Sequence, residues 1–399
     1  MVHVFLPWPR PGLVAGISAL LAGTLALSGC TSTPKKVVVP PTTTMVAPTT
    51  EAVVTPPPFT ATGIPAALAA VIEPLYFGGA VPSSPSAAKV LGKRQPVVAT
   101  GSVVVTGAVA SWKGVPIAVV TSGKDVTLAV AAPTWRVVGG WWPSVGVPAP
   151  SLGAGARRVL MVGSDARPGQ SVNTSRADSL HIVGLDGRGG GGVLGIARDA
   201  YVNLATGGRG KINSALTFGG PMGLQRTVVS VTGVPLEGYV ITGFDGFKRI
   251  IDGIGGLPMK VPVTVVGAGA DVVIKAGPNM LSGRAALAYG RQRHTVAGGD
   301  FGRSANQGLL IMAAAGFTKL SGPAKLPGIL QIAAPNITTN LSAEQVLTFA
   351  AGAFVTSPGK VHNRVAAGSF GWTADRQSIV LFDASARRMF ADIKDGNLS

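Results

Sequence analysis

The sequence predicts an α/β protein, with a layered domain in which helices flank a central sheet and a smaller α+β or β-rich module that precedes it. Two patterns point to this fold. Runs of strand type and helix type alternate after about residue 156. Residues 61–150 instead hold short β-rich runs separated by turn signals. A hydrophobic content of 46% over 399 residues supplies a large core and excludes a chain that is disordered throughout.

Residues 1–29 are predicted to be a secretion signal. Arg10 and the amino terminus carry positive charge, and the uncharged apolar run Leu13–Leu27 is shorter than a membrane span. The run ends in Leu-Ser-Gly-Cys, which resembles a bacterial lipobox, so we expect lipidation of Cys30 and attachment to a membrane. The alternatives are an ordinary signal with a chance cysteine and a signal anchor. In each case we expect the body to work outside the cytoplasm, without a nucleic acid partner. With the lipid anchor, its expected location is the outer face of the bacterial cytoplasmic membrane, in the cell envelope.

Residues 30–60 are rich in Thr and Pro and are predicted to be a semi-rigid spacer, since proline favours extended backbone. The module at 61–150 is expected to begin with helices at Pro65–Phe77 and Ala87–Leu91. Its expected strands are Val97–Val105, Val115–Thr121, Val126–Ala131 and Trp135–Val138. Ser144–Gly155 is interpreted as the linker that follows.

Four of the six tryptophans lie in this module, at positions 112, 135, 141 and 142. They could form a platform that stacks on sugars, or they could fill a thin core and a domain interface. We favour the second interpretation, because small modules commonly use Trp in this way. Exposure of Trp141 and Trp142 side by side would favour the first.

The large domain at 151–399 is expected to alternate strands with helices. Its expected strands are Arg158–Val162, Leu180–Leu185, Val193–Ile196, Tyr239–Thr242, Leu257–Val263 and Ser378–Phe382. Its expected helices are Gly223–Thr232, Gly246–Ile254, Ser282–Tyr289, Ser304–Leu320, Ala343–Gly352 and Ser385–Ile393.

Composition narrows the function. Lys plus Arg number 34 against 17 Asp plus Glu, so the net charge is +17 and a phosphate-bearing partner is expected. A single cysteine excludes an intrachain disulfide and a Cys-x-x-Cys zinc site. Gly187–Gly192 fits the spacing of a dinucleotide fingerprint, but a strand-like run follows it, so we expect a hairpin loop. His181 falls within an expected strand and is interpreted as a packed residue.

Acids and arginines cluster at the ends of the expected strands. Asp165 follows the first strand of the large domain, Asp178 precedes the second, and Arg198 and Asp199 end the third. Ligands bind in the crevice at strand ends of α/β sheets, and Mg²⁺ takes one or two carboxylates together with water or phosphate oxygens. Asp165 and Asp178 could therefore hold Mg²⁺ jointly.

The arginines exceed what two carboxylates need as partners. They stand at positions 176, 198, 291, 293 and 303. Guanidinium groups bind phosphate oxygens in a bidentate manner, so together they suit a pyrophosphate. The alternative is that they are solvated surface charges.

In this respect the chain resembles the LytR-CpsA-Psr family over roughly residues 157–395. The resemblance rests on ordered motifs: Val159–Arg167, Arg176–Ser179, Gly195–Asp199, Lys211–Ala215, Gly219–Pro221, Phe244–Phe247, Gly255–Leu257, Leu281–Tyr289, Arg291–Arg293 and Asp300–Arg303 with Gln307. The family implies a central mixed β-sheet and a membrane-attached enzyme that ligates glycopolymers to the bacterial cell wall. The donor would be a glycan linked to polyprenyl pyrophosphate, and the acceptor a peptidoglycan hydroxyl.

The resemblance also implies residue roles. Asp165 and Asp178 match the magnesium-associated acids, so the expected cofactor is Mg²⁺. The pyrophosphate-binding positions match Arg176, Arg198, Arg291, Arg293, Arg303 and Gln307. Asp199 is a candidate to orient or deprotonate the acceptor hydroxyl, or it pairs with a neighbouring arginine. Asn306 departs from the family, which commonly has a basic residue there.

The family further implies an apolar pocket for the polyprenyl chain, and Leu309–Phe317, Val346, Leu347 and Phe349 either line it or belong to an ordinary core. Two other functions stay open at this point. One is a polyprenyl-pyrophosphate pyrophosphatase, with water as the acceptor at the same site. The other is a non-catalytic lipoprotein that binds anionic wall polymer through its positive charge. An acid pair argues against the second, because a binding protein does not need one.

Overall fold

The computed structural model describes residues 59–96, 102–267, 271–293 and 298–399. The predicted secretion signal, Cys30 and nearly all of the spacer lie outside these residues. Within the described ranges, no helix is both long and apolar enough to cross a membrane.

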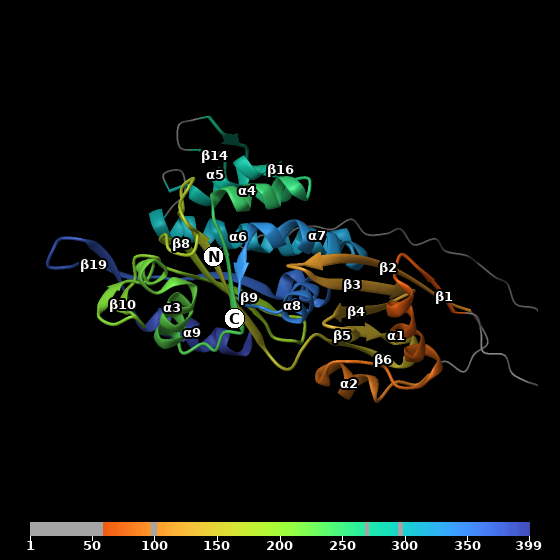
Figure 1. The fold of residues 1–399 in the computed structure, drawn as a ribbon. Coiled ribbons are helices and arrows are strands. Elements are labelled where there is room, and N and C mark those ends of the chain that lie inside the picture. Colours follow the sequence, from red (N-terminus) through yellow and green to blue (C-terminus); the bar gives the residue numbers. More distant parts are fainter. Residues whose placement is uncertain (1–58, 97–101, 268–270, 294–297) are drawn as a thin grey trace, which may run out of the picture. The chain divides into compact units, whose positions relative to one another are not determined.

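A six-stranded mixed sheet forms the centre of the large domain (Figure 1). Its spatial order is β17-β12-β7-β8-β9-β18. The strands are β7 (Arg157–Ser164), β8 (Ala177–Leu185), β9 (Gly191–Ile196), β12 (Gly238–Thr242), β17 (Thr338–Thr339) and β18 (Val361–Ala366). The pairs β12–β7 and β9–β18 are parallel and the other pairs are antiparallel, which confirms the expected mixed sheet.

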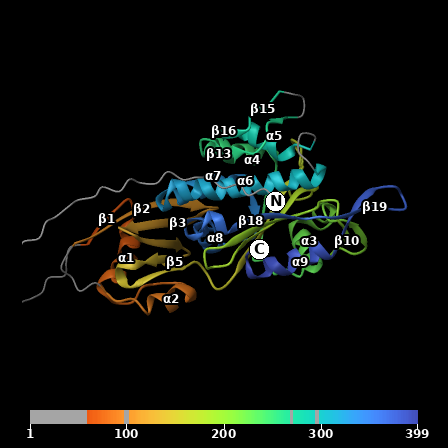
Figure 2. The same ribbon diagram turned by 180° about the vertical axis from the view of Figure 1, so that it is seen from behind.

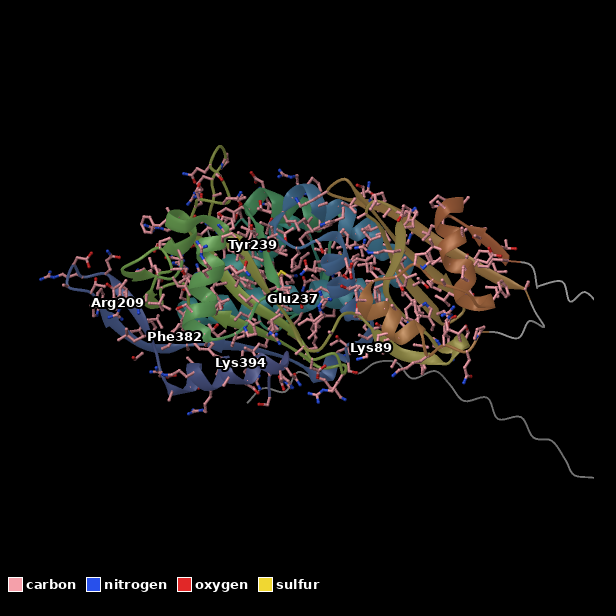
Figure 3. The ribbon with its side chains drawn as sticks, turned by 60° about the horizontal axis from the view of Figure 1, so that its bottom comes forward. Lys89, Arg209, Glu237, Tyr239, Phe382 and Lys394 are labelled. Atoms are coloured by element: carbon pink, nitrogen blue, oxygen red, sulfur yellow. The ribbon has the colours of Figure 1, made fainter. Side chains whose placement is uncertain are left out.

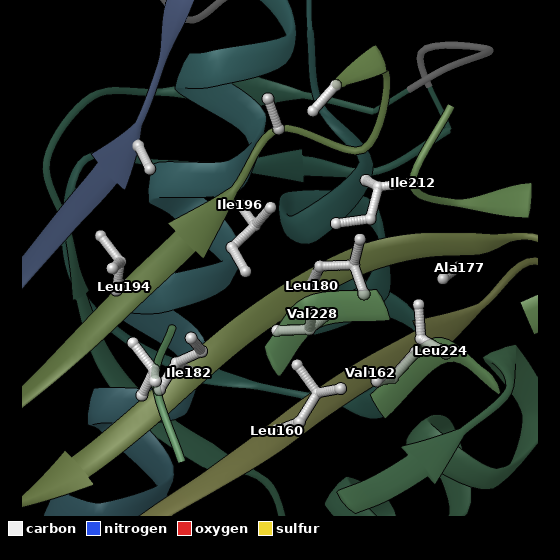
Figure 4. Close-up of a cluster of buried hydrophobic side chains, with 14 of the residues drawn as sticks. Leu160, Val162, Ala177, Leu180, Ile182, Leu194, Ile196, Ile212, Leu224 and Val228 are labelled. Carbon is white, nitrogen blue, oxygen red and sulfur yellow. The ribbon is translucent and has the colours of Figure 1, made fainter. Parts of the chain in front are cut away.

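Both faces of this sheet are covered by helices, because alternate strand residues are apolar on each side. Leu160, Ile182 and Leu194 project toward one face, where they pack with Leu224 and Val228 of one helix (Figure 4). The helices of the large domain are α3 (Ser214–Thr232), α4 (Phe244–Gly253), α5 (Gly283–Arg291), α6 (Gly299–Ser321), α7 (Leu326–Ala333), α8 (Ala343–Val355) and α9 (Ala384–Asp392). Helices α3 and α9 cover this first face, and α6, α7 and α8 lie on the opposite one (Figure 2).

Local sequence fixes two of these helices. A capping box starts α8, since the Ser342 side chain accepts from the Gln345 backbone and the Gln345 side chain accepts from the Ser342 backbone. Helix α6 packs very closely on β9 at Gly195, where an added Cβ would lie 2.4 Å from Ser304 Oγ. This close approach brings the first turns of α6 onto the strand ends.

The module at the N-terminal side is a second six-stranded sheet with two helices. Its strands, in spatial order, are β1 (Phe59–Thr62), β2 (Val103–Trp112), β3 (Val115–Ser122), β4 (Asp125–Ala131), β5 (Trp135–Trp142) and β6 (Val147–Ser151). The helices are α1 (Ala66–Phe77) and α2 (Pro85–Leu91). The α+β interpretation of this module is thus confirmed. Of the expected strand Val97–Val105, residues 97–101 lie outside the described residues and 103–105 begin β2.

The linker prediction for Ser144–Gly155 is wrong in its central part. Its prolines and glycines indicated a loop, but Val147–Ser151 pairs with β5 as an edge strand, a position that tolerates proline. The two regions also share one hydrophobic core. Ile117 and Leu128 of the module pack there with Leu330 of α7 and Leu347 of α8.

The packing interpretation is confirmed for Trp141 and Trp142, the pair whose joint exposure would have favoured a sugar-stacking platform. Trp142 is fully buried and its indole Nε1 donates to Thr127 Oγ1 at 2.8 Å. Trp141 lies at the interface with the large domain, 6.4 Å from the ring of Phe354 in α8. Trp112 is 3% exposed. These three described tryptophans are therefore packed and do not form a sugar-stacking platform.

Four small two-stranded sheets complete the described chain. They are β10 (Tyr201–Asn203) with β11 (Arg209–Lys211), β13 (Leu257–Val261) with β16 (Gly277–Leu281), β14 (Val265–Val266) with β15 (Val273–Ile274), and β19 (Gly368–Trp372) with β20 (Ser378–Phe382). Short 3-10 helices are η1 (Pro143–Val145), η2 (Pro323–Lys325), η3 (Ala334–Asn336), η4 (Pro358–Lys360) and η5 (Ile393–Asp395). The predicted strands at 257–263 and 378–382 therefore exist, but they lie outside the central sheet.

Candidate functional site

A cavity of about 810 Å³ lies between the central sheet and helices α4, α5, α6 and α8. One end is polar and is formed where β8 and α6 begin. The polar lining there includes Arg167, Asp178, Arg291, Arg293, Arg303 and Gln307. The other walls are apolar and follow α6 as far as Lys319. At 1.5 Å per helical residue, Arg303 and Lys319 are about 24 Å apart along the axis.

Asp178 reaches this cavity because of an irregularity in strand pairing. Gly163 pairs with Ser179 and Ser164 pairs with Ala177, so Asp178 is the extra residue of a β-bulge. A bulge redirects a side chain relative to the regular alternation of a strand, and bulges are frequent beside active sites. Asp178 Oδ1 then accepts from Arg198 Nη1 at 2.5 Å.

Asp300 is the centre of a larger charge cluster. Its carboxylate lies 3.4 Å from Arg198 Nε, 3.4 Å from Arg293 Nε and 3.0 Å from Arg303 Nη2. One carboxylate thus contacts three guanidinium groups. From the sequence, Asp300 is recognisable only as a member of the Asp300–Arg303 motif. Its contact with three arginines depends on how α6 packs against the sheet.

Arg303 is the least favourably placed cation of this cluster. It is 4% exposed, and its Nε is buried without a hydrogen-bond partner among the described residues. Burial, with the nearby positive charges of Arg198 and Arg293, lowers the pKa of Arg303 to about 10. Burial opposes the charge of Arg198 too, but Asp178 and Asp300 raise its pKa above the ordinary value. The cluster has positive charge to spare, and an incoming anion would stabilise it.

Three further residues line the cavity: Arg291, Gln307 and Arg167. The Arg291 guanidinium stacks 4.8 Å from the ring centre of Phe244 at the start of α4. Gln307 Nε2 donates to the Gly290 carbonyl at 2.9 Å, which aligns α6 with α5. Arg167 is exposed and lines the cavity, a position that its sequence motif did not predict.

The other predicted site residues lie beside the cavity rather than in its lining. Arg176 is exposed, and its backbone N–H donates to Asp165 Oδ1 at 2.9 Å. Arg198 does not line the cavity itself but contacts Asp178, which does. Asp199 lies 3.1 Å from Lys211 Nζ and 3.6 Å from Arg198 Nε, so the pairing alternative describes its contacts.

The donor set of Asp165 and Asp178 fits Mg²⁺. The two carboxylates come from the facing ends of β7 and β8, and each uses one oxygen in a hydrogen bond. Among the described residues there is no group of three or more His, Cys, Asp or Glu side chains that could enclose a metal. Mg²⁺ does not need one, since it keeps several waters and completes its shell with substrate phosphate.

The other sequence predictions near the site can be placed. His181 is fully buried, its Nε2 donates to the Ser304 carbonyl at 2.9 Å, and burial lowers its pKa to about 4, so it is a packed residue as predicted. The glycines at 187–192 belong to the β8–β9 hairpin, as expected. Asn306 is buried and accepts from Tyr289 Oη at 3.2 Å, away from the cavity lining. His294 lies outside the described residues.

Comparison with known proteins gives curated relatives of this chain. TagV of Bacillus subtilis, a polyisoprenyl-teichoic acid–peptidoglycan teichoic acid transferase by name, is 36% identical over 176 residues, or 42% of this chain and 45% of TagV. The probable cell wall biosynthesis protein LcpB of Corynebacterium glutamicum is 34% identical over 151 residues, or 35% of this chain and 36% of LcpB. TagU of Bacillus anthracis, with the same full name as TagV, is 31% identical over 194 residues, or 47% of this chain and 61% of TagU. The matches span less than two thirds of each relative.

Solved structures share the fold. The crystal structure of B. subtilis TagV superposes with a TM-score of 0.53 at 28% identity, covering 61% of this chain and 99% of TagV. A structure described as TagT bound to LI-WTA gives a TM-score of 0.52 at 24% identity, covering 61% of this chain and 92% of TagT. The second likeness concerns the fold alone.

The family profile matches the whole region that carries the site. It covers residues 148–388, more than half of the 399 residues, and begins inside the last strand of the small module. The ordered motifs, the mixed sheet and the arginine-lined cavity all fall within it. This chain belongs to the LytR_cpsA_psr family.

Proposed function

We propose that this protein is a phosphotransferase of cell-wall assembly. It moves a glycan-1-phosphate from a polyprenyl-pyrophosphate-linked glycopolymer to a peptidoglycan hydroxyl. The observation that carries the proposal is a single cavity with an arginine cluster at one end and apolar walls beyond it. An amphiphile with a doubly charged head and a long apolar tail matches this division.

The polar end suits a pyrophosphate. Arg291, Arg293 and Arg303 line it, and guanidinium groups bind phosphate oxygens in a bidentate manner. The surplus positive charge around Asp300 favours binding of an anion there. Exposed Arg167 lines the cavity and exposed Arg176 lies beside it, and both extend the positive field.

The apolar end suits a polyprenyl chain. Leu310, Ile311 and Ala314 of α6 line it, facing Phe349 of α8 and Phe247 of α4. Leu310 and Phe349 belong to the two segments for which lipid lining was one of two interpretations. The names of TagV and TagU support the kinds of donor and acceptor, since both name a polyisoprenyl-linked polymer and peptidoglycan.

In the proposed reaction the acceptor oxygen forms a bond to the phosphorus that carries the glycan. The bond from that phosphorus to the bridging oxygen breaks, polyprenyl phosphate leaves, and the hydroxyl proton is released. Arg291, Arg293 and Arg303 neutralise the charge that develops on the leaving phosphate. Asp199, held by Lys211, would orient the acceptor hydroxyl. Asp165 and Asp178 would hold Mg²⁺, which supplies further charge neutralisation.

The predicted lipid on Cys30 would anchor the protein at the outer face of the cytoplasmic membrane, next to a membrane-embedded donor. The spacer at 30–60 would then set the distance of the site from the lipid surface. Mass spectrometry of the membrane fraction would test this, with Cys30→Ala as the comparison. A protein that stays membrane-bound and unmodified would contradict lipidation.

Calorimetry of the full-length protein in detergent, titrated with a short polyprenyl pyrophosphate in Mg²⁺ or in EDTA, tests the donor site. We expect binding that Arg291→Ala and Asp178→Asn weaken at least tenfold, about the effect of one charge-assisted hydrogen bond. Arg388→Ala, which changes an exposed arginine on α9, is the control. Equal affinity in all variants would reject the cavity as the donor site.

Transfer is then separated from hydrolysis by following the glycan. Donor labelled in the glycan is incubated with insoluble peptidoglycan, and the label is measured in the pellet and in solution. Label in the pellet is expected. Label released only as soluble glycan phosphate would identify a pyrophosphatase, and Asp199→Asn with full transfer activity would remove the orienting role of Asp199.

A further inference from the structure

The β19–β20 hairpin presents two large aromatic side chains to solvent. Phe370 is 69% exposed and Trp372 is 72% exposed. They stand two residues apart on β19, so their side chains lie on the same face of the strand. Single exposed apolar residues are common, but two neighbouring rings on one face mark a surface that contacts something.

The base of this hairpin is joined to the candidate site. The Val380 N–H of β20 donates to the Asp199 carbonyl at 3.0 Å. The Phe370 ring stacks on that of Phe301, with centres 5.3 Å apart and planes at 27°. Phe301 directly follows Asp300, the shared partner of the three arginines. The row of rings therefore starts beside the charge cluster and leads outward.

The position of the hairpin separates it from the apolar part of the cavity. That part follows α6 away from Arg303 toward Lys319, whereas Phe301 lies at the opposite end of the same helix. Figures 1 and 2 both show β19 on the side away from the β1–β6 sheet. A molecule on the hairpin would thus approach the phosphates from the polar end, where an acceptor hydroxyl has to arrive.

The surroundings of the rings are polar and locally ordered. At the turn, the Gln377 N–H donates to Thr373 Oγ1 at 2.9 Å, and Gln377 Nε2 donates to Asp375 Oδ2 at 2.6 Å. Arg209 of the adjacent β10–β11 hairpin stacks 4.9 Å from the Tyr201 ring centre, and Figure 3 shows Arg209 and Phe382 at the same side of the view. Flat rings with amide, hydroxyl and guanidinium groups around them suit a ligand with apolar faces and polar edges.

We propose that the Phe370–Trp372 face binds the glycan strand of peptidoglycan that supplies the acceptor hydroxyl. Hexosamine rings offer apolar C–H faces to the aromatic rings and hydroxyl and acetamido groups to the polar edge. The assignment rests on the proposed function, because the acceptor follows from it. A lipid surface is the competing occupant, and the location at the phosphate end of the cavity, opposite the apolar walls, favours the glycan.

The test measures binding of a β-1,4-linked N-acetylglucosamine hexamer, and of insoluble peptidoglycan by co-sedimentation, to the full-length protein in detergent. We expect Trp372→Ala to weaken both about tenfold or more, as for an exposed Trp at the centre of a contact surface. Trp372→Tyr keeps a ring and should retain most of the affinity. Met280→Ala removes an equally exposed apolar side chain from another hairpin and should change nothing.

Two parallel measurements separate this inference from the proposed function. Polyprenyl pyrophosphate binding should be the same in Trp372→Ala and the unchanged protein. If the unchanged protein binds no donor but binds the hexamer through Trp372, the phosphotransferase proposal fails and the glycan surface stands. If the hexamer and peptidoglycan do not bind, or bind equally well to Trp372→Ala, the glycan surface is rejected. Loss of binding to phosphatidylglycerol vesicles alone would make the hairpin a membrane contact and also reject it.

Discussion

Arg157 and Arg303 are both buried guanidinium groups, but the chain satisfies them in different ways. Arg157 is 6% exposed and makes a bidentate pair with Glu237, through Nε at 2.8 Å and Nη2 at 2.6 Å. Its Nη1 also donates to the Leu152 carbonyl and to Thr348 Oγ1. These partners come from the segment before β7, from the residue before β12 and from α8, so Arg157 ties three parts of the fold together.

Arg303 is 4% exposed, and its carboxylate partner among the described residues, Asp300, is shared with two other arginines. Its Nε has no partner among the described residues, and its pKa is lowered to about 10. A buried cation costs free energy unless it is paired and hydrogen-bonded. The comparison indicates that the Arg157 group is complete as folded, and we propose that an anion completes the Arg303 group. Burial alone does not distinguish the two arginines, because their exposed fractions are nearly equal.

The largest effect is expected from Arg157→Met. It leaves Glu237, whose side chain is 24% exposed, without its partner and removes five hydrogen bonds among the elements around it. Breaking a buried pair from one side should lower the free energy of unfolding by about 3 kcal/mol. Urea unfolding measures this. Pyrophosphate affinity of the folded protein should be unchanged, and a loss of affinity without a loss of stability would reverse the comparison.

Arg303→Met makes the same chemical change in the other group. Inorganic pyrophosphate should bind up to about 100-fold more weakly, because one or two charge-assisted hydrogen bonds are lost. The free energy of unfolding should change by no more than about 1 kcal/mol, since repulsion from Arg198 and Arg293 is relieved. Calorimetry and urea unfolding on the same preparation give both numbers. Strong destabilisation with normal affinity would show that Arg303 is structural after all.

The pH dependence of stability tests the buried hydrogen bond of His181, which lies next to Arg303 in the fold. His181 bonds the carbonyl of Ser304, the next residue, and burial lowers its pKa from 6.5 to about 4. Because the folded pKa is depressed, the unfolded chain binds a proton first as pH falls below 6.5. Stability is therefore lost between pH 6.5 and 4, by about 2 kcal/mol at pH 5 from this residue.

His181→Gln should be less stable than the unchanged protein at pH 7 but should lose less stability on going to pH 5. Urea unfolding of both proteins at the two pH values gives the difference, in which the titration of the other groups largely cancels. Identical slopes would mean that His181 is protonated in the folded protein at pH 5 and is not held neutral by burial.

Strong local patterns in the sequence predicted most of the fold. The apolar runs that became β7, β8 and β9 were recognisable because their residues are buried on both sides of the sheet. The edge strand β18 was missed, since its sequence Val-His-Asn-Arg-Val-Ala is polar and only pairing with β9 makes it a strand. Helix α7 was missed too, as its proline and glycine hide a short amphipathic segment that packs on the module.

The candidate site was likewise predictable from the sequence only in part. Placing acids and arginines at strand ends required only the motif order and the alternation of elements. The bulge at Asp178 and the shared partner Asp300 depend on long-range packing, which brings α6 against β8 and β9 at Gly195. Arg176 and Asp199 were grouped with the other site residues by their place at strand ends and by the family resemblance, and the structure places them outside the cavity lining.

Asp300→Asn has the smallest expected effect and probes the shared partner directly. Without ligand, three arginines would face each other around a neutral amide, so the free energy of unfolding should fall by about 1 kcal/mol, a modest value because the side chain is 28% exposed. The same loss removes the internal carboxylate that competes with phosphate for Arg293 and Arg303. Added pyrophosphate should therefore raise the melting temperature of Asp300→Asn more than that of the unchanged protein, as thermal scans over a concentration series would show. If pyrophosphate stabilises the variant less, Asp300 positions the arginines for the ligand instead of competing with it, and the incomplete group of Arg303 owes its geometry to that carboxylate.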